Sequence, residues 1–339
     1  MTQKNDAKSP GYSPNVLVAD ALRKSYGKRT ALHGLSFTLQ AGRVMGFLGP
    51  NGAGKTTAIR ILTTILEADS GYFSVDGISS EFPEKIRGRI GVLPESLGFP
   101  KQITAVDFLT YFGQLYGQSA PYAKSNAKTL LEEVGLQQRA KSLVGTYSRG
   151  MRQRLGIARA LINEPAVVFL DEPTLGLDPR GQRELLVLVR RIASDRNAGV
   201  ILCSHLLTEI EGVCDEVVIL NLGQIVARGT VADVIGRVER NVLLKNTMKI
   251  RVPSTDVTKA RQILEALDSV KKVSAVGEME GWLEVELVDL GYGNTSTRYQ
   301  ITNTILAGLI REKIFILNFE TGSGRLQDVF LHLTEDVIE

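Results

Sequence analysis

"GPNGAGKTT", at residues 49–57, follows the apolar run "RVMGFL" at residues 43–48 and brings together three glycines, a lysine and two threonines. It fits the pattern Gly-x-x-x-x-Gly-Lys-[Ser/Thr]. The matching residues are Gly49, Gly54, Lys55 and Thr56. Apolar residues at helical spacing in "TTAIRILTTILE" predict a helix over residues 56–67. A strand, a glycine loop and a helix in this order predict a phosphate-binding loop, whereas a chance glycine bend needs no such context.

This loop has the chemistry that a polyphosphate requires. Its glycines let the backbone curl so that successive N–H groups point at phosphate oxygens. Lys55 is predicted to reach the β- and γ-phosphates, and the Thr56 hydroxyl to ligate Mg²⁺. The positive end of the following helix adds to the attraction. The candidate nucleotide-binding residues of the loop are Gly49, Pro50, Asn51, Gly52, Ala53, Gly54, Lys55, Thr56 and Thr57.

A second stretch, "VVFLDEP" at residues 167–173, places two acids after a buried strand. Ligands bind at the carboxyl ends of strands in open α/β sheets. Adjacent acids at a strand end often cap a helix. Beside a phosphate loop, however, they favour a role in binding a metal ion and in activating a water molecule. We therefore interpret Asp171 as a Mg²⁺ partner and Glu172 as the base for the attacking water.

The composition is typical of a globular protein, and the chain length favours two domains. The chain has 339 residues, 43% of them hydrophobic, and a net charge of +3, too small to indicate nucleic acid. Its two cysteines lack metal-site spacing and suit a reducing compartment. No run approaches the ~18 apolar residues of a membrane span, so a membrane role is expected to need a partner.

The periodicity outlines the domains. Residues 1–14 read as a flexible tail and residues 15–240 as an α/β domain with a mostly parallel sheet. Two consecutive helical patterns predict a helical subdomain over about residues 96–160. "EVVILNLGQIVARG" predicts a hairpin turning at Leu222-Gly223, followed by a short helix at 230–238.

After a linker near residues 239–247, the patterns restart as strand, helix, hairpin, helix and strand. This βαββαβ order predicts a smaller, α+β ferredoxin-like domain over residues 241–339. A final helix is expected in "GRLQDVFLHLTEDV", at residues 324–337. No catalytic constellation follows residue 240, and the single tryptophan, Trp282, is expected in the core of this domain.

Five motifs in order resemble the nucleotide-binding domain of ABC (ATP-binding cassette) transporters, over roughly residues 15–240. Besides the two above they are "YSRGMRQRL" at 147–155, "LGLDP" at 175–179 and "CSH" at 203–205. The first of these three is the most specific, because it is similar to the signature that separates this family from other phosphate-loop ATPases. The resemblance implies ATP hydrolysis by an ABC cassette fold.

The resemblance also assigns roles by position. Tyr26, in "KSYGKRTAL", matches the aromatic that stacks on adenine. Ser148 and Gly150 match signature residues that cap the γ-phosphate of ATP held by the other subunit. Asp178 is implied to join the two sites across the dimer. His205 matches the switch histidine that contacts the γ-phosphate and positions the base, and Cys203 beside it is expected in the core.

Three positions depart from the commonest family pattern. Arg149 and Met151 replace a glycine and the glutamine of the signature. In "IGVLPESLGF", at residues 90–99, Glu95 stands where the family usually has a glutamine that touches Mg²⁺ and the attacking water. "LPE" here, the signature and the "DVFL" ending resemble the drug-resistance (daunorubicin-type) and sodium-export branch. Glu95 is accordingly a candidate for both nucleotide and metal binding.

The resemblance implies an ATPase subunit of an exporter that forms a head-to-tail homodimer beneath a separate membrane permease, at the cytoplasmic face of the cell membrane. ATP, ADP and Mg²⁺ are its expected ligands, and no nucleic acid is expected. Two alternatives stay open. One is an importer ATPase with a ligand-sensing regulatory domain, and the other is a soluble ABC ATPase not coupled to transport.

Overall fold

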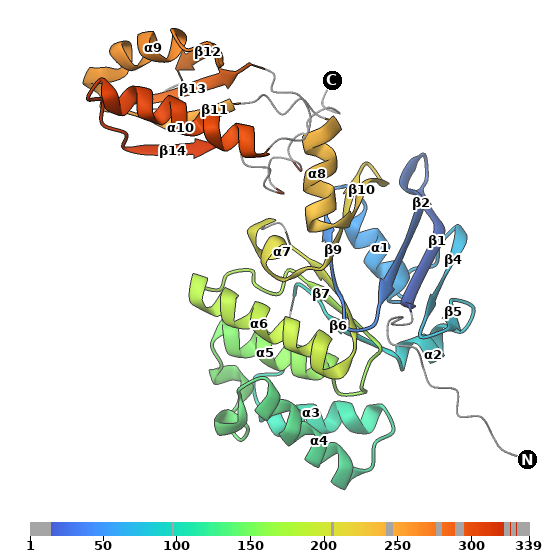
Figure 1. Ribbon diagram of the computed structural model, residues 1–339. Helices are drawn as coiled ribbons and strands as arrows, with labels where there is room; N and C mark the ends of the chain where they lie inside the picture. Colours follow the sequence, from blue (N-terminus) through green and yellow to red (C-terminus); the bar gives the residue numbers. More distant parts are fainter. Residues whose placement is uncertain are drawn as a thin grey trace, which may run out of the picture. The chain divides into compact units, whose positions relative to one another are not determined.

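The computed structural model describes residues 15–96, 98–204, 207–241, 247–275, 280–288 and 295–321, with Leu326 and Phe330 (Figure 1). The chain divides into two compact units, with the break between Val234 and Ile235, and Phe330 belongs with the first unit. The predicted tail and nearly all of the predicted final helix lie outside the described residues. No helix in the described ranges is long and apolar enough to cross a membrane.

The first unit is built on a six-stranded sheet in the order β10-β9-β3-β8-β7-β6. All neighbouring pairs are parallel except β9 and β10, which form an antiparallel hairpin. Its central strands are apolar along their whole length because helices and a second sheet cover both faces. The strands are β3 (Val44–Leu48), β6 (Ile90–Leu93), β7 (Val167–Asp171), β8 (Gly199–Cys203), β9 (Glu216–Asn221) and β10 (Gln224–Thr230).

A second, antiparallel sheet of four strands lies beside the first in the order β2-β1-β4-β5. The two sheets share one hydrophobic core, in which the rings of Phe37 on β2 and Phe47 on β3 meet edge to face with centroids 5.1 Å apart. This core fixes the start of the glycine loop that follows β3. The strands are β1 (Asn15–Tyr26), β2 (Arg29–Gln40), β4 (Ser70–Val75) and β5 (Ile78–Ser79).

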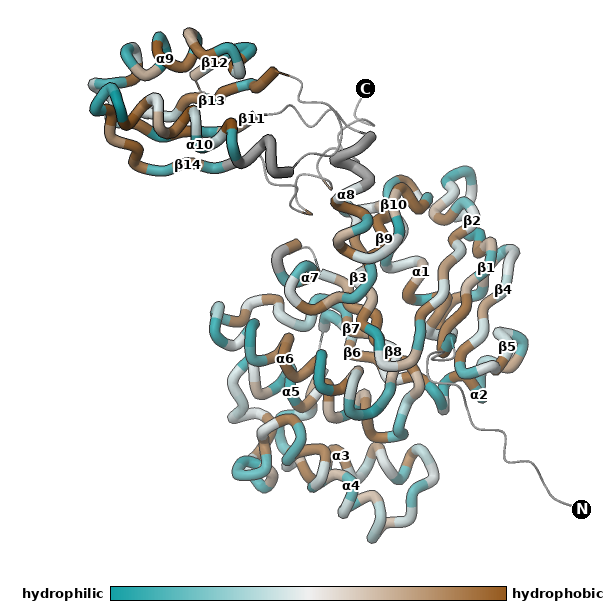
Figure 2. Tube along the Cα trace, in the orientation of Figure 1, coloured by the Kyte–Doolittle hydropathy of each residue, from teal (hydrophilic) through white to brown (hydrophobic). Residues whose placement is uncertain are grey.

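Seven α-helices lie in the described residues of the first unit, and an eighth, α8, crosses the break between Val234 and Ile235. They are α1 (Lys55–Leu62), α2 (Pro83–Arg87), α3 (Ala105–Leu115), α4 (Ala120–Glu133), α5 (Arg149–Ala160), α6 (Pro179–Arg196), α7 (Leu207–Val213) and α8 (Val231–Asn241). The helices α3, α4 and α5 pack on one another within the predicted helical subdomain. Along α6, buried apolar residues alternate with exposed charged ones (Figure 2).

Two sequence-based boundaries differ from the structure. The helix after the glycine loop ends at Leu62 instead of residue 67. The Thr63 hydroxyl donates to the Ile59 carbonyl at 2.7 Å, and Thr64 has a φ of 61°, so the chain turns away and leaves Ile65 72% exposed. The helix predicted at 230–238 continues as α8 to Asn241, inside the predicted linker.

The second unit has the predicted βαββαβ order. Its antiparallel sheet runs β12-β13-β11-β14, with both longer helices packed on it. This order confirms the ferredoxin-like prediction. The tryptophan Trp282 is half-buried at the start of β13. The elements are β11 (Thr247–Arg251), α9 (Val257–Glu265), β12 (Val270–Ala275), β13 (Trp282–Leu287), α10 (Thr295–Arg311) and β14 (Asn318–Thr321).

Candidate functional site

A cavity of about 1370 Å³ opens at the carboxyl ends of β3, β6 and β7, where loops from the parallel sheet converge. It is large enough for a nucleotide. It brings together most of the predicted site. The predicted residues that line it are Tyr26, Gly49, Pro50, Asn51, Gly52, Ala53, Gly54, Lys55, Thr56, Thr57, Glu95, Asp171 and Glu172.

The glycine loop is wrapped tightly between β3 and α1. Gly49 has a φ of 153° and Gly54 a φ of 104°. A Cβ on Gly49 would lie 2.4 Å from the Leu220 carbonyl oxygen, so a larger residue would displace the loop from the sheet. The Lys55 ammonium donates to the carbonyls of Gly49 and Pro50, which holds the cation over the loop. The positive end of α1 opens into the same space.

The loops that follow β6 and β7 bring acidic side chains to the cavity. Burial raises the pKa of the Asp171 carboxyl above its ordinary value, and the neighbouring charges of Glu95 and Glu172 raise it further. Lys55 and Arg60 act in the opposite direction. Three carboxylates thus share the cavity, and a bound cation would relieve their repulsion.

The oxygen donors in the cavity fit Mg²⁺. Carboxylate and hydroxyl oxygens, here from Asp171, Glu95 and Thr56, are the ligands that Mg²⁺ prefers. In the described ranges, no three Asp, Glu, His or Cys side chains converge closely enough to hold a metal by themselves. The arrangement therefore suits Mg²⁺ that is shared with phosphate oxygens.

Glu172 has an unusual backbone that the sequence does not reveal. Its φ is 48°, in the left-handed region that residues other than glycine seldom adopt. Its N–H donates to the Cys203 carbonyl at 2.9 Å, which ties the end of β7 to the end of β8. Strained residues of this kind gather at functional sites because the surrounding structure must hold them in place.

Sequence reasoning missed two cations in the cavity. Arg29 and Arg60 line it together with Lys55, and the Arg29 side chain lies against Gly52 of the glycine loop. Their positive charges complement a polyphosphate. Arg29 follows Tyr26 by three residues, so its place near the loop could have been inferred from the β1–β2 turn. Tyr26 itself is 49% exposed at the end of β1, with its ring available for stacking.

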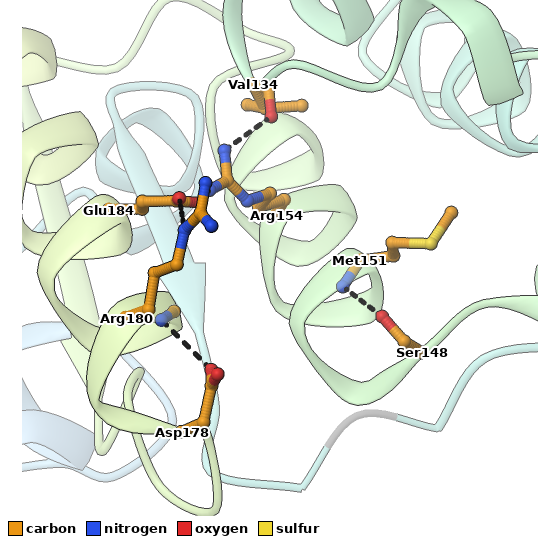
Figure 3. Close-up of polar contacts among 8 residues, drawn as sticks. Val134, Ser148, Met151, Arg154, Asp178, Arg180 and Glu184 are labelled. Carbon is orange, nitrogen blue, oxygen red and sulfur yellow. Dashed lines mark hydrogen bonds and ion pairs between the residues drawn. The ribbon is translucent and has the colours of Figure 1, made fainter.

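Of the predicted site residues that the structure describes, three do not line this cavity: Ser148, Gly150 and Asp178. They lie instead at the starts of α5 and α6 (Figure 3). The Ser148 hydroxyl oxygen accepts from the Met151 N–H at 3.3 Å, and Asp178 Oδ1 accepts from the Gly181 N–H at 3.0 Å. Each caps its own helix.

An ion-pair cluster holds α5 and α6 together (Figure 3). Glu184 on α6 accepts from Arg154 of α5 and from Arg180 of its own helix, both at 2.9 Å. Arg149 lies along Gly176, where a Cβ would meet its guanidinium carbon at 2.6 Å. The arginine that departs from the signature pattern thus packs on the turn before α6.

His205 lies outside the described residues, so its predicted role stays a prediction. Its described neighbours Ser204 and Leu207 both line the cavity. Cys203 is 1% exposed, and burial raises the pKa of its thiol well above the ordinary value, which fits the expected core position.

Comparison with known proteins gives concordant results. The "ABC transporter" family model matches residues 32–175. The chain is 31% identical to the linearmycin resistance ATP-binding protein LnrL of Bacillus subtilis, over 94% of this chain and 98% of that protein. It is 33% identical to the daunorubicin/doxorubicin resistance ATP-binding protein DrrA of Streptomyces peucetius, over 94% and 92%. A solved ATP-binding subunit of an ABC transporter superposes with a TM-score of 0.59 at 30% identity, covering 66% of this chain and 93% of that one.

Proposed function

The chain belongs to the ABC transporter family of ATP-binding proteins, and on that premise we propose that it is the ATP-hydrolysing subunit of an exporter. As an ABC ATPase, it binds and hydrolyses ATP. The export role is supported by relatives that match nearly its whole length and are named for resistance to linearmycin and to daunorubicin and doxorubicin. A separate permease would carry the transported molecule, with this subunit at the cytoplasmic face of the membrane.

The residues that line the cavity suggest how the protein binds and hydrolyses ATP. Tyr26 stacks on the adenine, and the backbone N–H groups of residues 49–57 and the Lys55 ammonium bind the phosphates. Thr56, Asp171 and Glu95 would hold Mg²⁺, whose positive charge would offset the charge on the phosphate oxygens. Glu172 accepts a proton from the water that attacks the γ-phosphorus, which leaves ADP and phosphate.

We further propose that two copies of the chain complete each site. The observation that carries this proposal is the separation within one chain: Lys55 and Glu172 line the cavity, whereas Ser148 and Asp178 cap the starts of two helices and do not line it. The N-terminus of α5 offers its dipole and N–H groups to an anion. In a head-to-tail dimer, Ser148 and Gly150 of one copy would close over the γ-phosphate bound by the other.

The export proposal is tested by recovering the partner. The tagged chain, purified from detergent-solubilised membranes of its own cells, is expected to retain a polytopic membrane protein. A Lys55→Ala chain serves as the control for nucleotide-independent capture. Recovery of ribosomes, nucleic acid or a substrate-binding importer in its place would contradict the proposal.

Replacing Glu95 by glutamine is expected to change both stability and metal dependence. The substitution removes one of the charges that raise the pKa of Asp171, so the metal-free protein loses repulsion. We expect the Tm without metal to rise by about 1–3 °C and the Mg²⁺ concentration needed for half-maximal activity to increase. Scanning calorimetry and a Mg²⁺ titration of ATPase activity measure the two effects.

Glu67→Gln, an exposed acid outside the cavity, is the matched control for Glu95→Gln. Glu95 also follows β6 and precedes the helical subdomain. We therefore expect the substitution to reduce permease-stimulated turnover more than basal turnover. Unchanged Tm and Mg²⁺ dependence would show that Glu95 lies apart from the metal.

Ending the chain at Asn241 is expected to leave ATP affinity within about threefold of the full chain, a change of under ~1 kcal/mol. The first unit contains the glycine loop and the acidic strand end, and it has its own core. Because Phe330 lines the cavity, Phe330→Ala in the full chain is the matched control. Nucleotide titration by calorimetry measures affinity, and loss of ATP binding by a truncated but folded chain would contradict the domain division.

A further inference from the structure

A buried carboxylate on α7 has no role in the mechanism above. Glu209 is 6% exposed, and its Oε2 accepts from the hydroxyls of Thr174 and Ser204, each at 2.8 Å. Both donors are themselves 1% exposed. The three side chains therefore form a buried hydrogen-bond network.

This network joins the two loops that carry the proposed chemistry. Thr174 lies two residues after Glu172, in the turn between β7 and α6. Ser204 follows β8 and lines the cavity, directly before His205 in the sequence. The backbone bond from the Glu172 N–H to the Cys203 carbonyl runs between the same two loops. Glu209 adds a side-chain connection from a third element.

The network is costly for a purely structural feature. A carboxylate removed from water loses its hydration, and apolar residues of similar volume often pack as well or better. The second oxygen, Oε1, is also buried and has no hydrogen-bond partner in the part of the chain that the structure describes. A half-satisfied buried group of this kind calls for an explanation beyond packing.

Glu172 supplies that explanation. Its left-handed backbone at a φ of 48° persists only while its surroundings hold it. The Thr174 hydroxyl, bound to Glu209, anchors the turn two residues later. Without that anchor the turn can relax, and the Glu172 carboxylate moves relative to the phosphates. Displacements of about 1 Å at a catalytic group cost about 10²-fold in rate.

We propose that Glu209 is a positioning residue for ATP hydrolysis, which joins the Glu172 turn to the loop that leads into His205. The inference rests on the proposed function of Glu172. It assigns Glu209 no contact with ATP. Its loss should therefore lower kcat and leave nucleotide binding unchanged.

The test measures kcat, KM and ATP affinity of the full chain with Mg²⁺ and ATP. Glu209→Ala is expected to lower kcat by about 10–100-fold, with KM and ATP affinity within about threefold. Glu209→Gln keeps an oxygen that can accept both hydroxyls, so it should restore kcat to within about threefold of wild type. Glu211→Gln, an exposed acid on the same helix, should match wild type.

Thr174→Val and Ser204→Ala remove the two donors one at a time; the first keeps the side-chain size, and the second removes only the hydroxyl. Each is expected to lower kcat by about 3–10-fold, but neither should lower it further once Glu209 is alanine. These two variants also decide the matter if Glu209→Ala fails to fold. Wild-type kcat in both donor variants would overturn the inference, as would equal losses in kcat and ATP affinity.

A parallel Glu172→Gln variant separates the two proposals. If Glu172→Gln is inactive and the Thr174 and Ser204 variants keep full kcat, only the positioning role of Glu209 is wrong. If Glu172→Gln hydrolyses ATP near the wild-type rate, the proposed catalytic role of Glu172 is wrong, and the inference about Glu209 is overturned with it.

Discussion

Glutamine in place of Glu172 is expected to lower ATP turnover by about 10²–10⁴-fold while ATP remains bound. The amide keeps the size of the side chain and its place at the end of β7. It cannot accept a proton at neutral pH, so the attacking water loses its base. Because binding by Lys55 and the glycine loop is untouched, ATP should accumulate and hold the proposed dimer closed.

Three measurements check this expectation. Steady-state turnover gives the loss in rate, calorimetry gives ATP affinity, and light scattering with ATP gives the mass of the closed species. Glu67→Gln, which changes the same charge outside the cavity, is the control and should match wild type in all three. A Glu172→Gln chain that turns over ATP at the wild-type rate would show that the base lies elsewhere.

Much of the site could be predicted because local patterns carry it. The glycine loop needs left-handed backbone at Gly49 and Gly54, and only glycine adopts it readily. The buried run before Asp171 predicts a strand whose end faces the loop, and the parallel pairing of β7 with β8 and of β8 with β3 confirms it. The predicted hairpin does turn at Leu222-Gly223, where both residues have positive φ, a backbone that Gly223 adopts readily.

Other features arise only from tertiary contacts. The helical pattern of the sequence does not predict that α1 ends at Leu62. The helix ends there beside the hydrogen bond from the Thr63 hydroxyl to the Ile59 carbonyl, which the sequence does not reveal. Glu209 reads as an ordinary helical acid, and its partners Thr174 and Ser204 lie on loops that the sheet brings together. The left-handed backbone of Glu172 also depends on a tertiary contact, the hydrogen bond from its N–H to the Cys203 carbonyl of β8. Glutamate has no preference of its own for this conformation.

The last prediction concerns the completion of each site by a second copy. Lys55→Ala removes the cation over the glycine loop, and Ser148→Arg places a bulky cation at the start of α5. Each homodimer should lose ATPase activity by at least about 10²-fold, since phosphate positioning and the γ-phosphate cap act in the same step. The two losses have different causes, which makes the variants complementary.

In a mixed dimer of these two variants, one site collects both defects. The other site combines Lys55 from one chain with Ser148 from its partner, and both residues are intact there. The two inactive proteins are therefore expected to recover up to about one quarter of wild-type activity on mixing: random pairing makes half the dimers mixed, each with one intact site. Differently tagged chains, co-purified through both tags, isolate the mixed species for the assay.

The control is a mixture of Lys55→Ala with the double variant Lys55→Ala/Ser148→Arg. No dimer in that mixture has an intact Lys55, so activity should stay at the level of the separate proteins. Recovery in the first mixture but not in the second places Ser148 and Lys55 on different chains of one working site. Wild-type ATPase activity from Ser148→Arg alone would contradict the model, because the start of α5 would then face no nucleotide.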